Sequence, residues 1–102
     1  MPIGCVVGDK LHVLTERGDL GYGRGKSGSW WALIAFDALC DEQVELPYPY
    51  TLWVFPVETR LAVERLLRKR GRELRMVSHP ELGAELSRIV QEARDKPEDT
   101  EA

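Results

Sequence analysis

Three prolines between residues 44 and 56, in the segment VELPYPYTLWVFP, constrain the fold of this chain more than any other feature. Proline fixes φ, lacks a backbone N–H and holds the residue before it in an extended conformation. Pro47, Pro49 and Pro56 therefore exclude a helix interior from this segment. Residues 51–55 are rich in β-branched and aromatic side chains, which predicts a strand that ends at Pro56.

The N-terminal residues predict two neighbouring strands. Residues 3–7 are apolar, and residues 10–15 carry the pattern of a half-buried strand. Gly8 lies between the two segments and tolerates the positive φ that a tight turn requires. We therefore expect a β-hairpin at the start of the domain.

Residues 29–40, SWWALIAFDALC, are so apolar that periodicity does not separate a buried strand from a buried helix. Their alanines and leucines favour a helix, for which Ser29 is a suitable cap. Their aromatic and β-branched members favour a strand. We predict a strand over residues 29–36 and a turn over residues 37–41.

The second half of the chain has the periodicity of helices. Residues 57–70 place apolar side chains on one face, and Gly71 suits the position just after a helix end. Ser78 and Glu81 have the spacing of a capping box, and an apolar stripe follows them. Two helices are therefore expected here.

These elements predict one α+β domain, a size that suits a chain of 102 residues. The expected elements are a small antiparallel, partly barrel-like sheet within residues 3–55, a helix over 57–71, a short strand over 73–77 and an amphipathic helix over 79–94. We expect the apolar faces of both helices to cover the open side of the sheet. The domain would span residues 1–94, and the acidic residues 95–102 predict a disordered tail.

The sequence also predicts the cellular setting. It contains no apolar run of membrane-spanning length, and its N-terminus lacks the pattern of a secretion signal. We therefore expect a cytoplasmic protein in which Cys5 and Cys40 are reduced thiols. The cysteines and histidines lack paired spacing, so we expect neither a metal site nor a cofactor.

Charge is segregated along the chain, although the net charge is only −3. Residues 60–75 hold seven basic residues against two acidic ones, whereas residues 37–59 hold five acidic residues and no lysine or arginine. Such a local basic patch can contact an acidic partner or phosphates. The candidate binding residues in this patch are Arg65, Arg68, Lys69 and Arg72, of which the three arginines share a helical stripe if the helix reaches Arg72.

Aromatic residues offer a second kind of candidate. A small domain does not bury every tryptophan and tyrosine of this chain, and an exposed aromatic side chain is a frequent contact in interfaces. We select Trp30 and Tyr48 as candidates, together with the basic residues Arg24 and Lys26 of the glycine-rich segment.

That segment, GYGRGKSG at residues 21–28, resembles part of a phosphate-binding loop. Such a loop needs G-x-x-x-x-G-K-[ST] between a strand and a helix. Gly25, Lys26 and Ser27 match its end, but Leu20 stands where the first glycine belongs. Nucleotide binding would also require a helix after the loop, and we predict a strand there.

Three short segments resemble small SH3-like, Tudor-like barrels of bacterial transcription-associated proteins, such as the N-terminal modules of the CarD and RapA families. The matching segments are Leu20-Gly21-Tyr22-Gly23-Arg24, residues 33–37 and Glu45-Leu46-Pro47. The resemblance covers about half of the chain. It implies a binding module for RNA polymerase or nucleic acid, without catalysis.

We therefore expect a non-enzymatic interaction module that binds a protein partner, such as a component of the transcription machinery, or nucleic acid. We expect no membrane association, and the small core makes homo-oligomerisation an open alternative. A second hypothesis is a small regulatory or inhibitor protein that acts through one tight complex, which the acidic segment would suit. A third is nucleotide binding by the loop at residues 21–28.

Overall fold

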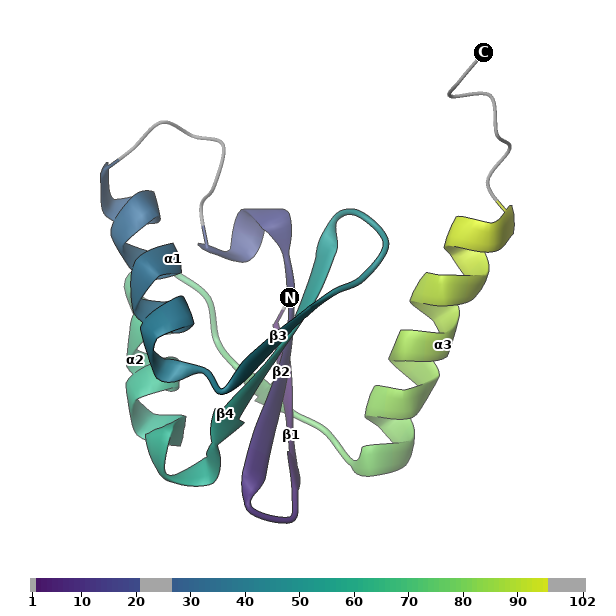
Figure 1. The fold of residues 1–102 in the computed structure, drawn as a ribbon, viewed down its shortest axis with the longest axis horizontal. Coiled ribbons are helices and arrows are strands. Elements are labelled where there is room, and N and C mark those ends of the chain that lie inside the picture. Colours follow the sequence, from purple (N-terminus) through teal and green to yellow (C-terminus); the bar gives the residue numbers. More distant parts are fainter. Residues whose placement is uncertain (1, 21–26, 96–102) are drawn as a thin grey trace.

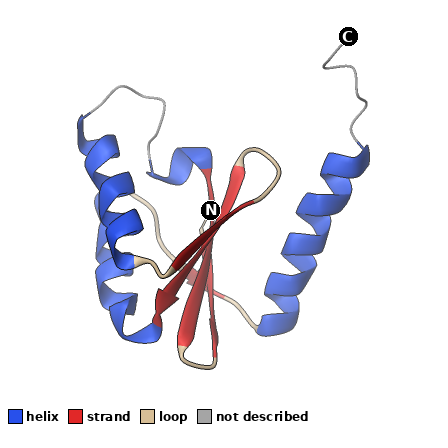
Figure 2. Ribbon diagram, in the orientation of Figure 1, coloured by secondary structure: helices blue, strands red, loops and turns tan. Residues whose placement is uncertain are grey.

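The structure, a computed structural model, describes residues 2–20 and 27–95, with side chains described from residue 32 in the second range. A twisted sheet forms the middle layer, with helices on both of its faces (Figures 1 and 2). The elements in chain order are β1 (Ile3–Val7), β2 (Lys10–Glu16), η1 (Arg17–Leu20), α1 (Ser27–Leu39), β3 (Glu42–Glu45), β4 (Tyr50–Pro56), η2 (Val57–Thr59), α2 (Arg60–Lys69), β5 (Arg75–Met76) and α3 (His79–Asp95).

The sheet has five strands in the order β3-β4-β2-β1-β5. The β1–β2, β2–β4 and β3–β4 pairs are antiparallel, whereas β5 pairs with β1 in parallel. The expected α+β class, a small sheet followed by helices, is confirmed. The sheet is mixed and does not close on itself.

The strand register sends apolar side chains to both faces of the sheet, because successive residues of a strand point to opposite sides. Val13 lies opposite Trp53, and both belong to the cluster on the face covered by α1 and α2. Leu14 lies opposite Ile3, and both belong to the cluster that includes Leu82 and Ile89 of α3. Each face therefore needs its own helical cover.

This arrangement corrects the expectation that both C-terminal helices lie on one side of the sheet. Val63 and Leu67 of α2 are fully buried in one cluster, and Leu82 of α3 is buried in the other. Figure 1 shows α1 and α2 together on one side and α3 alone on the other. The expectation failed because it treated only one face of the sheet as apolar.

The prediction of a strand over residues 29–36, with a turn over 37–41, is also wrong, because α1 spans Ser27–Leu39. Ala32 and Phe36 are buried at a spacing of four residues, and Ile34 is exposed. The Phe36 ring packs edge-on against Trp53, with ring centroids 5.2 Å apart, and makes the same contact with Phe55. In a strand, residues 34 and 36 would point to the same face, whereas in a helix they point to nearly opposite sides. A helix therefore packs Phe36 against the aromatic side chains of β4 and leaves Ile34 exposed.

The turns and helix ends follow the sequence more closely. Gly8 and Gly71 both have positive φ, at 64° and 75°, as their expected turn and helix-end positions require. The Ser78 hydroxyl accepts a hydrogen bond from the Glu81 N–H at 3.2 Å, so the predicted N-cap of α3 is confirmed. Asp95, placed in the tail by sequence, is the last residue of α3, and residues 96–102 lie outside the described part.

Candidate functional site

The exposed side of α2 carries the first candidate site. Val63 and Leu67 are buried against the sheet, and the helical rotation of 100° per residue turns Arg65, Arg68 and Lys69 to solvent. We call these three residues the basic face. Within residues 2–20 and 27–95, none of the three has an ion-pair partner.

An apolar side chain adjoins the basic face. Leu61 is 65% exposed, although it lies on a helix whose other leucines are wholly or partly buried. It precedes Arg65 by one turn and Arg68 by two turns, so the three lie along one line of the helix. The surface thus combines unpaired positive charge with an exposed leucine.

Arg72 is not part of this surface. The helix ends at Lys69, so the condition for a shared stripe with Arg65 and Arg68 is not met. The Arg72 Nε instead donates to the Asp19 carboxylate at 3.1 Å, and its Nη2 donates to the Gly18 carbonyl at 3.3 Å. The Asp19 side chain is only 4% exposed. Arg72 therefore links the segment that follows α2 to η1.

Two more basic residues of the 60–75 cluster are engaged in ion pairs. Arg60 pairs with Glu64 on the same helix, and Arg75 pairs with Glu81 of α3. Arg70, the residue after α2, is partly buried, and its Nε has no hydrogen-bond partner among the described residues. Three of the seven basic residues of the cluster, Arg65, Arg68 and Lys69, therefore remain as the exposed basic face.

Tyr48 forms a separate candidate at the tip of the β3–β4 hairpin. Its side chain is 75% exposed, and the peptide bond to Pro49 is cis. The Arg17 guanidinium lies over its ring, 5.9 Å from the centroid. The hairpin tip is distant from α2 (Figure 1), so the structure does not join Tyr48 to the basic face.

The remaining sequence candidates are not placed. Arg24 and Lys26 lie outside the described residues, and Trp30 belongs to α1, but its side chain is not described.

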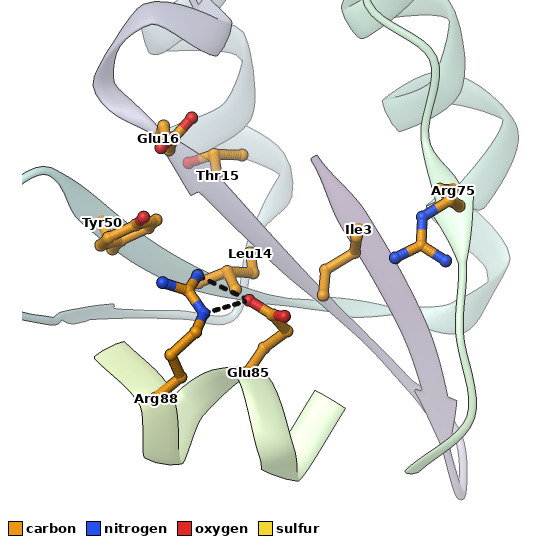
Figure 3. Close-up of a pocket in the computed structure, with 8 residues that line it drawn as sticks. All are labelled: Ile3, Leu14, Thr15, Glu16, Tyr50, Arg75, Glu85 and Arg88. Carbon is orange, nitrogen blue, oxygen red and sulfur yellow. Dashed lines mark hydrogen bonds and ion pairs between the residues drawn. The ribbon is translucent and has the colours of Figure 1, made fainter. Parts of the chain in front are cut away.

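Cavities beside Tyr50, the first residue of β4, were not anticipated from sequence. Three of them share Tyr50 as a lining residue, and two also share Tyr48. The cavity in Figure 3 has a volume of about 170 Å³, and its lining combines the apolar Ile3 and Leu14 with four charged residues, Glu16, Arg75, Glu85 and Arg88. The Arg88 guanidinium at its edge donates to Glu85 at 2.7 Å. No sequence signal joins this part of α3 to the hairpin, because the two are far apart in the chain.

The two thiols lie on opposite faces of the sheet. Cys5 belongs to the cluster under α3, and Cys40 packs against the cluster on the opposite face. Burial raises the pKa of the Cys40 thiol, and the nearby Asp37 carboxylate raises it further, which disfavours the nucleophilic thiolate. Burial lowers the pKa of His12, with a smaller effect from His79. Among the residues that the structure describes, no three His, Cys, Asp or Glu side chains converge as metal ligands.

Comparison with known proteins found no matching family model, no similar characterised protein and no similar solved structure. No helix in the described part of the chain is long and apolar enough to cross a bilayer.

Proposed function

We propose that this protein is a non-enzymatic interaction module whose basic face binds an acidic surface of a partner protein. The observation that carries the proposal is the exposure of Arg65, Arg68 and Lys69 without ion-pair partners in the described residues, beside the exposed Leu61. Arginine is enriched in protein interfaces, and an exposed leucine loses water when a partner covers it. The surface offers both kinds of contact on one rigid helix.

A protein partner suits this surface better than nucleic acid does. Nucleic-acid binding draws most of its affinity from many phosphate contacts, and the basic face supplies three cations. The net charge of −3 would also repel a polyanion at long range. Leu61 has no role in phosphate binding, but it suits the centre of a protein interface.

The test compares complexes captured from a lysate of the source cells, with and without nuclease. We expect a nuclease-resistant complex that the triple variant Arg65→Ala, Arg68→Ala, Lys69→Ala loses and that Leu61→Ala weakens. Arg94→Ala, on the exposed side of α3, is the matched control for loss of a surface cation. Loss of the complex on nuclease treatment would favour nucleic acid, and equal capture by the triple variant would refute the proposed surface.

Nucleotide binding is a second candidate, favoured by one observation. Helix α1 begins at Ser27, within the last residues of the glycine-rich segment, so a helix lies where a phosphate-binding loop requires one. However, β2 before the segment has only antiparallel neighbours, unlike the parallel sheets that carry such loops. A melting temperature that rises with ATP or GTP in the parent protein, and not in Lys26→Ala, would support this candidate.

A further inference from the structure

Strand β3 forms an open edge of the sheet. Among the described strands it has one neighbour, β4, because the strand order is β3-β4-β2-β1-β5. Figure 1 shows α1 and α3 on either side of the sheet, and neither helix lies over β3. The opposite edge strand, β5, has only two residues, whereas β3 has four. The β3 edge is therefore the longer of the two places where a further strand can add to the sheet.

The hydrogen bonds to β4 show which backbone groups of β3 point outward. The Leu46 N–H donates to the Tyr50 carbonyl at 3.2 Å, in register with the pairing of Val44 and Leu52. In an antiparallel pair, every second residue forms its hydrogen bonds with the same neighbouring strand. Gln43 and Glu45 therefore direct their N–H and carbonyl groups away from β4. Such a row of outward backbone groups is a template for an added strand.

The charge of this edge indicates the chemistry of the added strand. Glu42 and Glu45 have exposed side chains, and neither has an ion-pair partner in the part of the chain that the structure describes. The two side chains point to opposite faces of the sheet, because they are three residues apart on a strand. Opposite charges directly across a strand pair stabilise it, and like charges destabilise it. The edge therefore favours a strand with two cations that are also three residues apart.

A second copy of this chain is a poorer occupant. Pairing of two β3 edges would bring four glutamates together and would join two chains that each carry a net charge of −3. A neutral strand would gain only the backbone hydrogen bonds. We propose that the open edge of β3 binds an extended strand of a partner protein that carries one lysine or arginine opposite Glu42 and another opposite Glu45. This surface is separate from the basic face, which lies on α2.

The probe is the blocked peptide acetyl-Thr-Lys-Val-Val-Lys-Thr-amide, added to ¹⁵N-labelled protein and followed by NMR with amide hydrogen exchange. Its sequence reads the same in both directions, so the result does not depend on strand orientation. We expect weak, saturable binding that weakens with salt and protects the amide protons of residues 43 and 45. The amide of residue 44 already points to β4, so its protection should not change.

A second peptide, acetyl-Thr-Lys-Val-Lys-Val-Thr-amide, has the same composition, but its lysines are two residues apart and point to the same side. It should bind about two- to fivefold more weakly, because only one lysine can lie opposite a glutamate. Replacing both lysines of the first peptide by glutamate should abolish binding.

Variants of the protein separate the backbone contact from the charge contact. Gln43→Pro removes an outward N–H, a change that an edge strand tolerates, and should weaken binding at least about fivefold. Gln43→Ala keeps this N–H and should bind like the parent protein. Glu42→Gln should weaken binding about two- to fivefold. Glu45→Gln should have a smaller effect, because Arg17 lines the same hollow as Glu45.

A charge reversal provides a test that does not depend on the folding of Gln43→Pro. The double variant Glu42→Lys, Glu45→Lys should lose the lysine peptide and bind the glutamate peptide instead. Arg65→Ala, from the basic face, should bind the lysine peptide as the parent protein does, so the two surfaces are tested independently.

Three results would overturn the proposal. The first is equal binding of the two lysine peptides, and the second is protection that appears at residues other than 43 and 45. The third is protection of residues 43 and 45 that rises with protein concentration and with salt in the absence of peptide, which would identify a second copy as the occupant of the edge.

Discussion

Replacing Asp19 by alanine should destabilise the protein, because the Asp19 carboxylate binds both the Glu16 backbone and the Arg72 side chain. It should not affect binding of a partner protein, because neither Asp19 nor Arg72 belongs to the basic face. The Asp19 carboxylate accepts a hydrogen bond from the Glu16 N–H at 2.8 Å and another from Arg72 Nε at 3.1 Å. Its side chain is 4% exposed, whereas that of Arg72 is 42% exposed. The backbone contact is thus protected from water, and the ion pair is partly screened.

The magnitude follows from these two contacts. A hydrogen bond to a charged group contributes about 1.5–3 kcal/mol, and an ion pair with one exposed member contributes about 1 kcal/mol or less. We expect Asp19→Ala to lower the free energy of unfolding by about 3 kcal/mol and Arg72→Ala to lower it by about 1 kcal/mol. Asp19→Asn keeps an acceptor for the Glu16 N–H, so its loss should lie between these values.

Urea unfolding at neutral pH measures these changes, and the double variant gives the coupling between Asp19 and Arg72. We expect a coupling of about 0.5–1 kcal/mol. Arg68→Ala is the matched control from the basic face and should change stability by less than about 0.5 kcal/mol. A coupling of zero, with Asp19→Ala near the parent stability, would contradict a stabilising role for the Asp19–Arg72 pair and return Arg72 to the candidate binding residues.

Two further predictions test the core and the pH dependence. Phe36→Ala should cost about 3–5 kcal/mol in urea unfolding, because Phe36 is fully buried against Trp53; a loss below about 1 kcal/mol would contradict the inward face of α1. Folding lowers the pKa of His12, so the folded protein favours the neutral imidazole. The free energy of unfolding should therefore have its full value above the ordinary pKa of 6.5 and should decrease as the pH falls below 6.5. His12→Gln should flatten this part of the stability profile, and an unchanged slope in that variant would assign the effect to other groups.

Local chemistry was sufficient to predict several elements. The prolines around residues 51–55, the alternation near the N-terminus and the cap at Ser78 each act on neighbouring residues. The corresponding strands β4, β1 and β2 and the helix α3 are present. The basic cluster was equally visible, since charge is a property of composition.

The state of residues 29–36 depended on contacts that are distant in sequence. Their apolar side chains suit a buried strand and a buried helix equally well, so the periodic signal is absent. The decision came from Trp53 and Phe55, whose rings need the cover that Phe36 supplies from a helix. The prediction that both C-terminal helices pack on one side of the sheet was wrong for a related reason. The sheet carries apolar residues on both faces, and each face is covered by a different helix.

Local sequence specifies a strand that ends at Pro56, a capped C-terminal helix and a regional excess of positive charge. Tertiary contacts specify which of those charges remain available, because Asp19 and Glu81 pair with Arg72 and Arg75, whereas Arg65, Arg68 and Lys69 have no ion-pair partner among the described residues. It also brought the hairpin tip against α3 and formed the cavity beside Tyr48. Helical and strand patterns are local, whereas ion pairs and cavities depend on residues that meet only after folding.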